Sequence, residues 1–511
     1  MLRNLLRSAT AITVGQMIII FGNLAVVPLF LAHWSSAVYG EWMALSAAVA
    51  YLTSLDMGMN AATGNSLVVA YAHGDQSRYQ SVQSSAMVFY MVLAAAVSAL
   101  TGAACLFFPL SRWLGVTHIQ QHIAALIVWI MALRLMWQMP AAQIWNIFRT
   151  MGDQATTQWV WNVQFLGGIL ATCCAVALGG SPSTVALWAM VPFLAVTLAA
   201  WGWLRRRYPQ LLPTLRTANR IEIRNLLCPS LFFGLITVGS AVALNGPVVA
   251  VSSVAGGAAV TLLVTTRTLA TVVRQAQSIL TTAIWPHLTR MHAAGARSAL
   301  RTTHRVLIAV SMVASIALAS TIWFEGPEII AVWTRGRLSC DIRLLRVFLV
   351  AAVFQALWVA SSMVLIATNR HRALAKSYLF SALIATAVTA LLVKRLGPVA
   401  AAVGLILGEA VSCYHFVLKD SCAAVGEVYS AFATRMWASL ILVSSMTSVA
   451  ALIAHRLAWG PAPIRWMETG IVALVTSSTG VWTFFLGSTR QTILARIGPR
   501  IMPQVDAEST C

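Results

Sequence analysis

The sequence predicts an all-α polytopic membrane protein. Of its 511 residues, 59% are hydrophobic and only 9% are charged, and the mean hydropathy is +0.79. A soluble domain carries roughly 25% charged residues, so this chain cannot cover a water-facing surface of its size. Lipid is therefore expected to be its main solvent. The apolar runs have the length of membrane-crossing helices, in which the backbone bonds to itself.

Fourteen apolar runs have the length of about 17–25 residues that crosses a bilayer. The first follows a short basic start and no A-x-A cleavage pattern comes after it, so we expect it to be retained as a span. Only KRLG (394–397) separates the eleventh run from the twelfth. The expected spans are 10–32, 40–62, 83–108, 122–145, 157–179, 185–204, 229–251, 258–281, 306–332, 345–367, 377–393, 399–418, 436–457 and 466–487.

The basic residues indicate which side of the membrane the loops face. The termini and the even-numbered connections hold 22 of the 34 Lys and Arg residues, the opposite loops and span ends hold nine, and Arg134, Arg267 and Arg274 lie deeper inside spans. The positive-inside rule then predicts that both termini are cytoplasmic. A net charge of +20 in a soluble protein would suggest nucleic acid. Here the loop distribution accounts for the charge, so membrane lipid is an expected partner and nucleic acid is not.

A weak internal repeat predicts two lobes. NSLVVAYAHGDQSRYQ (65–80) and PHLTRMHAAGARSALR (286–301) share four of sixteen positions at an offset of 221 residues. The same offset carries the first span near the seventh and the third near the ninth, with an even number of spans between the copies. This predicts two pseudo-symmetric six-helix lobes in parallel orientation. The expected segments are lobes at 1–208 and 229–420, a basic cytoplasmic linker at 209–228, and an extra helix pair with a tail at 421–511.

The sequence lacks the common motifs for nucleotide binding and metal binding, and it has no room for a soluble catalytic domain. No loop exceeds about 25 residues, which leaves no room for a catalytic domain. The sequence contains no G-x-x-x-x-G-K phosphate loop, no H-E-x-x-H zinc motif and no C-x-x-C pair. We therefore expect no cofactor, no bound metal and no ATP hydrolysis, and a protein that is not an enzyme.

Asp56 is the first candidate for a functional residue. An ionisable group at the bilayer centre costs at least about 2.5–3.5 kcal/mol, so it needs a partner or a wet cavity. Asp56 is expected near mid-depth of a long second helix. In one interpretation it is structural, as a partner for Arg134 or as a cap at a helix break near Gly58. In the other it lines a hydrated path and binds a cation or a proton.

Two arginines lie on one predicted helix face. Arg267 and Arg274 are seven residues apart, a spacing that returns to within about 20° of the same side of a helix. Polar neighbours extend this face, which suggests that it lines an aqueous cavity. A guanidinium suits a diphosphate because it stays charged and donates paired hydrogen bonds. Arg274 has a second interpretation, in which it reaches toward the lipid headgroups. Arg134 is a third mid-span cation, either substrate-facing or salt-bridged.

The other candidates are a glutamate and two asparagines. Glu409 follows GLILG (404–408), whose two glycines predict a close helix-packing face. It is interpreted either as an anchor of that packing or as a cation- or proton-coupling group. Asn60 and Asn245 are either polar groups of a cavity or partners in hydrogen bonds between helices.

Several segments together resemble a known family. YGEWMALSAAVAYLTSLDMGMNAATGNSLVVAYAHGD (39–75) resembles the second-helix signature of bacterial polysaccharide-export flippases, with Y-G-x-W followed by L-D-x-G. TTRTLATVVRQAQSILTTAIWPHLTRMHAAG (265–295) looks like the eighth helix of these proteins, and GPEIIAVW (326–333) like the end of the ninth. They belong to the multidrug/oligosaccharidyl-lipid/polysaccharide exporter superfamily. Most members carry twelve spans, and the extra pair here looks like the lipid II flippase arrangement.

The resemblance implies a function in the bacterial inner membrane. The expected protein is a flippase that translocates polyprenyl-diphosphate-linked oligosaccharide by alternating access, with a polysaccharide polymerase and glycosyltransferases as partners. An alternative is a cation-coupled multidrug or metabolite exporter. Organic cations would favour an acidic cavity, whereas three mid-span arginines face two acids here. A membrane-embedded polymerase or glycosyltransferase would be expected to carry a long outer loop, which the sequence lacks.

The predicted orientation can be tested with a fusion reporter. A reporter that is active only in the periplasm, fused after Gly498, should give no signal, because even-numbered spans return the chain to the cytoplasm. The same reporter placed between Arg112 and His118, in a predicted outer loop, is the positive control. A strong signal from the Gly498 fusion would contradict the orientation and show an odd number of spans.

Overall fold

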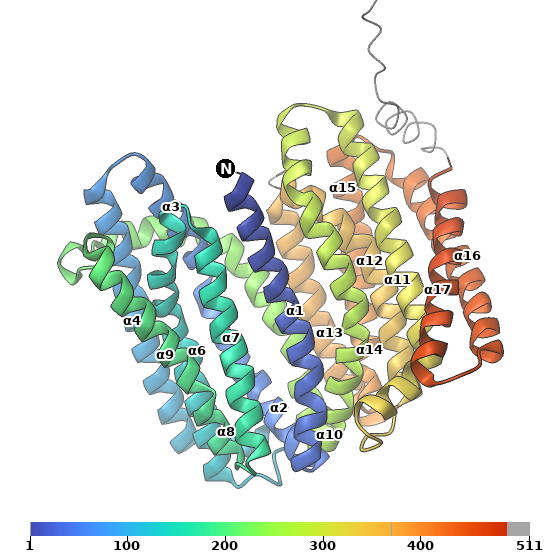
Figure 1. Cartoon of the computed structure of the whole chain (residues 1–511), viewed down its shortest axis with the longest axis horizontal. Coiled ribbons are helices and arrows are strands. Elements are labelled where there is room, and N and C mark those ends of the chain that lie inside the picture. The colour runs from blue at the N-terminus through green and yellow to red at the C-terminus, as the bar shows by residue number, and fades with distance from the viewer. Residues whose placement is uncertain (1, 369, 488–511) are drawn as a thin grey trace, which may run out of the picture. The chain divides into compact units, whose positions relative to one another are not determined.

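The computed structural model describes residues 2–368 and 370–487, and this part of the chain is helical without any strand (Figure 1). Eleven of its helical segments are long and apolar enough to cross a membrane. The predicted class, an all-α polytopic membrane protein, is confirmed. The helices up to the linker are α1 (Leu2–His33), α2 (Ser36–Ala50), η1 (Tyr51–Asp56), α3 (Met59–Ala72), α4 (Gln76–Phe107), α5 (Leu110–Trp113), α6 (Gln121–Thr150), α7 (Gln154–Ala177), α8 (Pro182–Trp188) and α9 (Met190–Arg207).

The second part of the chain contains the longest helices. After two short turns, η2 (Pro209–Leu211) and η3 (Leu215–Thr217), the elements are α10 (Arg220–Ala293), α11 (Arg297–Trp333), α12 (Ile342–Ala367), α13 (His371–Leu396), α14 (Val399–Ser412), η4 (Cys413–Val417), α15 (Leu418–Val425), α16 (Tyr429–Leu457), α17 (Ala462–Gly480) and η5 (Val481–Phe485). Every predicted span has a helical counterpart in this list. The C-terminal segment with Arg490, Arg496 and Arg500 lies outside the described residues.

The element α10 is two membrane helices joined by a sharp turn. Its backbone leaves the helical region at Gly256, where φ is 76° and ψ is −178°. Arg267 donates a hydrogen bond to the Leu244 carbonyl, and these residues lie on opposite sides of Gly256 at similar distances along the chain. The two halves therefore run antiparallel, and they correspond to the predicted seventh and eighth spans.

The second span is not the long continuous helix that the sequence predicts. The α-helix α2 tightens into the 3₁₀ helix η1, which ends at Asp56. Met57 and Gly58 then adopt left-handed backbone angles, with φ of 48° and 72°, before α3 begins at Met59. Only glycine takes this conformation without strain, and the L-D-M-G sequence supplies one. The prediction of a single helix through Asp56 is wrong, whereas a break at Gly58 was one of its alternatives.

The chain forms two compact units. The first comprises residues 1–268, 330–344 and 378–409, and the second 269–329, 345–377 and 410–511. The helices α10 to α14 each pass from one unit into the other, so the unit boundaries differ from those of the predicted lobes at 1–208 and 229–420. The two-lobe division stays a prediction.

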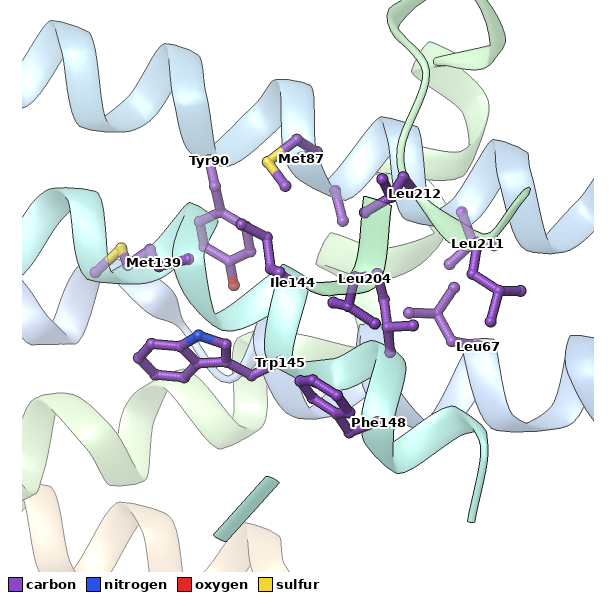
Figure 2. Close-up of a cluster of buried hydrophobic side chains, with 14 of the residues drawn as sticks. Leu67, Met87, Tyr90, Met139, Ile144, Trp145, Phe148, Leu204, Leu211 and Leu212 are labelled. Carbon is purple, nitrogen blue, oxygen red and sulfur yellow. The ribbon is translucent and has the colours of Figure 1, made fainter. Parts of the chain in front are cut away.

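In the first unit, α1 packs along α7, and α4 packs along α6 (Figure 1). The core between α3, α4, α6 and α9 is built from large side chains. Figure 2 shows Tyr90 and Met87 of α4 facing Met139, Ile144 and Trp145 of α6. Leu211 and Leu212, from the start of the linker, close the same cluster. The linker is therefore part of the fold of this unit and not a loose tether.

In the second unit, polar contacts fix the extra helix pair α16 and α17 to α11. At one end, the Arg305 guanidinium bonds the Glu427 carboxylate, with Nε 2.8 Å from Oε1. At the other end, His455 lies 2.8 Å from Glu325, and Arg465 lies 2.5 Å from Glu328. Contacts at both ends of a helix fix its direction as well as its position. The pair is thus an integral part of the unit.

Glycines allow two helix contacts at backbone distance. A Cβ on Gly40 would lie 1.6 Å from the Gly257 carbonyl oxygen, so the start of α2 touches the second half of α10 directly. In α14, a Cβ on Gly408 would lie 2.3 Å from the Ser381 carbonyl oxygen, and Gly404 meets Ala385 in the same way. The helix-packing face predicted from GLILG is therefore confirmed, with α13 as its partner.

The contact at Gly40 can be tested by adding one methyl group. Gly40→Ala should destabilise the protein by roughly 1–3 kcal/mol, because overpacking forces the two backbones apart. Thermal unfolding in detergent measures the loss. Gly202→Ala is the matched control, since nothing lies within 4 Å of a Cβ there. Alanine in that helix should be neutral or stabilising by up to about 1 kcal/mol. Equal melting temperatures for the two variants would contradict the contact.

Candidate functional site: a polar cluster at the break in the second span

Asp56 lies at the end of η1 and bonds a neighbouring helix. The Tyr90 hydroxyl of α4 donates to the Asp56 carboxylate at 2.5 Å, and Tyr90 itself is fully buried. The preceding hydroxyls bond the backbone of η1: Thr53 donates to the Ala50 carbonyl at 2.7 Å and Ser54 to the Tyr51 carbonyl at 2.5 Å. The carboxylate is thus left to interact outside its own helix.

The start of α3 provides an electrostatic environment for this carboxylate. The Ala62 N–H donates to the Gly58 carbonyl, so the N–H groups immediately before it have no carbonyl within the helix. Such groups give a helix N-terminus a partial positive charge that stabilises nearby anions. Asp56 stands three residues before Met59, the first residue of α3. Within the described part of the chain, no ion pair joins Asp56 to Arg134 or to another cation.

Asn60 connects α3 to α6. Its side-chain oxygen accepts hydrogen bonds from Gln143 at 2.9 Å and from Asn146 at 2.7 Å. Gln83 of α4 extends the network by donating to the Gln143 carbonyl at 2.9 Å. Asn60 thus makes hydrogen bonds between helices, and its role as a polar group of a cavity stays a prediction.

The polar cluster formed by Asp56, Asn60, Gln83, Gln143 and Asn146 contains oxygen atoms that can accept further hydrogen bonds. The side-chain oxygens of Gln83 and Gln143 are buried and have no hydrogen-bond partner among the described residues. Together with the Asp56 carboxylate they are acceptors of the type that bind cations or hydroxyl donors. A small cation, a proton or a polyol is the chemistry that this arrangement can accommodate.

Gln83, Gln143 and Asn146 were missed by the sequence analysis. Gln143 and Asn146 stand three residues apart, one helical turn, after Pro140 in an otherwise apolar run. Polar side chains at this spacing share one face of a helix. That spacing was a usable signal for a polar contact, although it does not identify Asn60 as the partner.

Arg134 lies on α6 without the predicted carboxylate partner. Its Nε is buried and has no hydrogen-bond partner among the described residues. The guanidinium points toward α7, where a Cβ on Gly168 would lie 3.4 Å from Nη2. Of its two interpretations, the salt bridge to Asp56 is not present, and the substrate-facing role stays a prediction.

The remaining candidates lie on α10 and α14. Arg267 donates to the Leu244 carbonyl at 2.6 Å across the α10 hairpin, while Asn245 bonds the Ala241 carbonyl of its own helix at 3.0 Å. Arg274 follows two turns later on the same helix and is half-buried. Glu409 is buried at the end of the glycine face of α14. The structure thus brings Asp56 and Asn60 to one break, and Arg267 and Asn245 to one hairpin.

Glu41 is a buried carboxylate that the sequence analysis passed over. It is fully buried and accepts the backbone N–H groups of Thr117 at 2.7 Å, His118 at 2.8 Å and Ile119 at 2.8 Å. The His118 ring lies 2.9 Å from the same carboxylate. Glu41 therefore organises the loop that leads into α6, and its role is structural.

Comparison with known proteins identifies the fold. No family model matches the chain, and no curated protein matches it. Among solved structures, an inward-facing multidrug resistance transporter of the MATE family of the MOP superfamily is 14% identical. Its TM-score is 0.67 over 79% of this chain and 95% of that one. The lipid II flippase MurJ, in an inward closed conformation, is 10% identical with a TM-score of 0.65, over 95% of this chain and 99% of that one.

A third structure is a MOP superfamily transporter from Pyrococcus furiosus, described as having a binding pocket of reverse polarity. It is 13% identical, with a TM-score of 0.57 over 83% of this chain and 96% of that one. At these identities the likeness is one of fold. The chain has the multi-pass helical fold of MOP superfamily transporters.

The network around Asn60 can be tested by removing its oxygen. Asn60→Ala should lower stability by roughly 1–3 kcal/mol, because the amide donors of Gln143 and Asn146 lose their acceptor in a buried site. Asn245→Ala is the matched control and should cost less, since its amide bonds only a carbonyl of its own helix. Thermal unfolding of both purified variants is the measurement. A larger loss at Asn245 would contradict the network.

Proposed function

We propose that the protein is an inner-membrane flippase that translocates polyprenyl-diphosphate-linked oligosaccharide for cell-surface polysaccharide synthesis. The observation that carries the proposal is the match to the lipid II flippase, which extends over 95% of this chain and 99% of that one. The match to the MATE transporter covers 79% of this chain. A longer match is expected if α16 and α17 have counterparts in the flippase.

The charge inside the spans supports an anionic substrate. Arg134, Arg267 and Arg274 are cations inside the spans, against the acids Asp56, Glu409 and Glu325, of which Glu325 contacts His455 and Thr469. In the proposed mechanism the arginines hold the diphosphate, because a guanidinium binds phosphate oxygens in pairs. Asn60 and Asn245 contribute polar contacts to the substrate path. Alternating access then exposes this path to each side of the membrane in turn.

A broken helix at mid-membrane is a recurrent feature of transporter binding sites, because its free backbone groups serve ions or substrate. The break at Met57–Gly58 has this form, and Asp56 lies beside it with a neutral hydroxyl as partner. We propose that Asp56 couples a cation or proton gradient to transport, with Glu409 as a second candidate. We further propose that both termini lie in the cytoplasm. A polysaccharide polymerase and glycosyltransferases are the proposed partners.

A cation-coupled multidrug or metabolite exporter is the alternative function. The observation in its favour is the likeness to MATE transporters, together with the spare oxygen acceptors at the cluster. The arginines argue against organic cations as substrates, since like charges would meet in one path.

Arg267 is the residue whose substitution tests the proposal. Arg267→Ala should abolish export while membrane abundance stays near wild type, because the arginine is proposed to bind substrate. Arg267→Lys should restore only part of the export, since an ammonium keeps the charge but loses the paired hydrogen bonds. Arg274→Ala should show a smaller loss. The measurement is cell-surface polysaccharide alongside quantified protein in the membrane fraction.

Arg337→Ala is the matched control for this experiment. Arg337 also donates to a main-chain carbonyl, that of Leu31, but it lies in a loop after α11. Its loss should leave export unchanged. Normal export by Arg267→Ala would overturn the diphosphate role. Efflux of organic cations by the purified wild type in vesicles, without translocation of lipid-linked oligosaccharide, would favour the alternative function.

A further inference from the structure

The first unit carries an apolar groove that the proposed transport path does not use. The groove lies between α4, α6 and α9, encloses about 590 Å³, and ends at Pro213 and Thr214 of the linker. Large apolar side chains dominate its walls. Met87 and Ile144, both labelled in Figure 2, lie on two of these walls. The lining residues Met91 and Leu194 are 40% and 47% exposed, so the groove opens on the outer surface of the helices.

The length of the groove matches one leaflet of a bilayer. Along α9 the lining extends from Met190 to Trp201, eleven residues further on. At 1.5 Å per residue this distance is about 16 Å. Half of a hydrocarbon core about 30 Å thick is about 15 Å. A single lipid chain entering from the linker side would therefore be covered along its full depth in that leaflet.

The mouth of the groove is strongly basic. Six exposed arginines lie at the end of α9, in the turns that follow it and at the start of α10: Arg205, Arg206, Arg207, Arg216, Arg220 and Arg224. Arg205 follows the lining residue Trp201 by four positions, which places both on the same face of α9. Arg216 stands two residues beyond Thr214. The acidic groups of this region are Glu222 on the linker side and Asp75 at the start of α4.

Hydrogen bonds hold this mouth in one shape. The Ser84 hydroxyl accepts from the Thr214 N–H at 2.9 Å and from the Thr217 hydroxyl at 2.9 Å. Ser85 accepts from the Asn219 N–H at 2.8 Å. These bonds attach the linker to α4 directly beside the groove. The arginines are thus presented on an ordered segment, which lowers the entropy cost of binding a headgroup.

We propose that this groove binds one hydrocarbon chain of an anionic phospholipid from the surrounding bilayer, with Arg205 and Arg216 holding its phosphate. Basic pockets between membrane helices on the cytoplasmic side bind phosphate headgroups, and anionic lipid is attracted to clusters of four to eight Lys or Arg residues. Charge complementarity at the mouth and an apolar wall of one-leaflet depth favour this occupant. The site is independent of the proposed substrate and of Asp56.

Native mass spectrometry of the full chain tests the headgroup. Phosphatidylglycerol should remain bound more tightly than phosphatidylcholine with the same chains. Arg205→Gln with Arg216→Gln should weaken phosphatidylglycerol binding by roughly fivefold for each arginine. Lys394→Gln with Arg395→Gln removes two exposed charges at the end of α13 and is the matched control, with no change expected. Equal retention of the two lipids would overturn the proposal.

Filling the groove tests the chain. Leu194→Trp places a large ring at the lining of the groove, and should release the bound phosphatidylglycerol. Leu198→Trp is the matched control, because Leu198 lies one turn along α9, is 67% exposed and does not line the groove. Both positions face outward, so both variants should fold, which melting temperature checks. Equal lipid retention by the two would overturn the proposal, as would displacement of phosphatidylglycerol by equimolar polyprenyl phosphate.

Discussion

The requirement to satisfy every backbone polar group inside lipid governs this structure. Helices meet it by themselves, so a break within a span must be compensated by side chains. At the break before α3, the hydroxyls of Thr53 and Ser54 bond carbonyls of η1, while Tyr90 bonds the Asp56 carboxylate. Asn60 then joins α3 to α6 through two further bonds. The break is therefore a constructed feature, and neighbouring helices contribute most of its partners.

The same requirement explains the chain segment between α5 and α6. Backbone N–H groups that precede a helix need acceptors, and here Glu41 of α2 provides them for three consecutive residues. At the preceding residue of the same helix, the bare backbone of Gly40 allows contact with Gly257. A carboxylate and a glycine side by side thus join α2 to a loop and to α10. Loops this short leave few other ways to hold helix ends together.

The sequence predicted those features that depend on one segment alone. Span positions follow from hydropathy, and the close packing of α14 follows from the spacing of Gly404 and Gly408. The break at Gly58 was less predictable. The hydropathy of an apolar run indicates how favourably it transfers into lipid, but it carries no information on backbone dihedral angles. The partners of Asn60 and Glu41 were unpredictable, since they lie more than seventy residues away along the chain. Three-dimensional pairing of polar groups is information that composition and periodicity do not contain.

Three structural acids have different partners from Asp56, the first candidate for coupling. Glu41 is held by three backbone N–H groups, Glu427 by an arginine, and Glu325 by His455 and Thr469. Each of these contacts fixes the acid in place. Asp56 bonds a neutral tyrosine hydroxyl instead, and no described cation pairs with it. One hydroxyl and a helix N-terminus hold the Asp56 carboxylate less firmly than the partners of Glu41, Glu427 and Glu325 hold theirs. A small cation that binds to or leaves Asp56 would therefore break no ion pair among the described residues, which is a property that the proposed coupling residue needs.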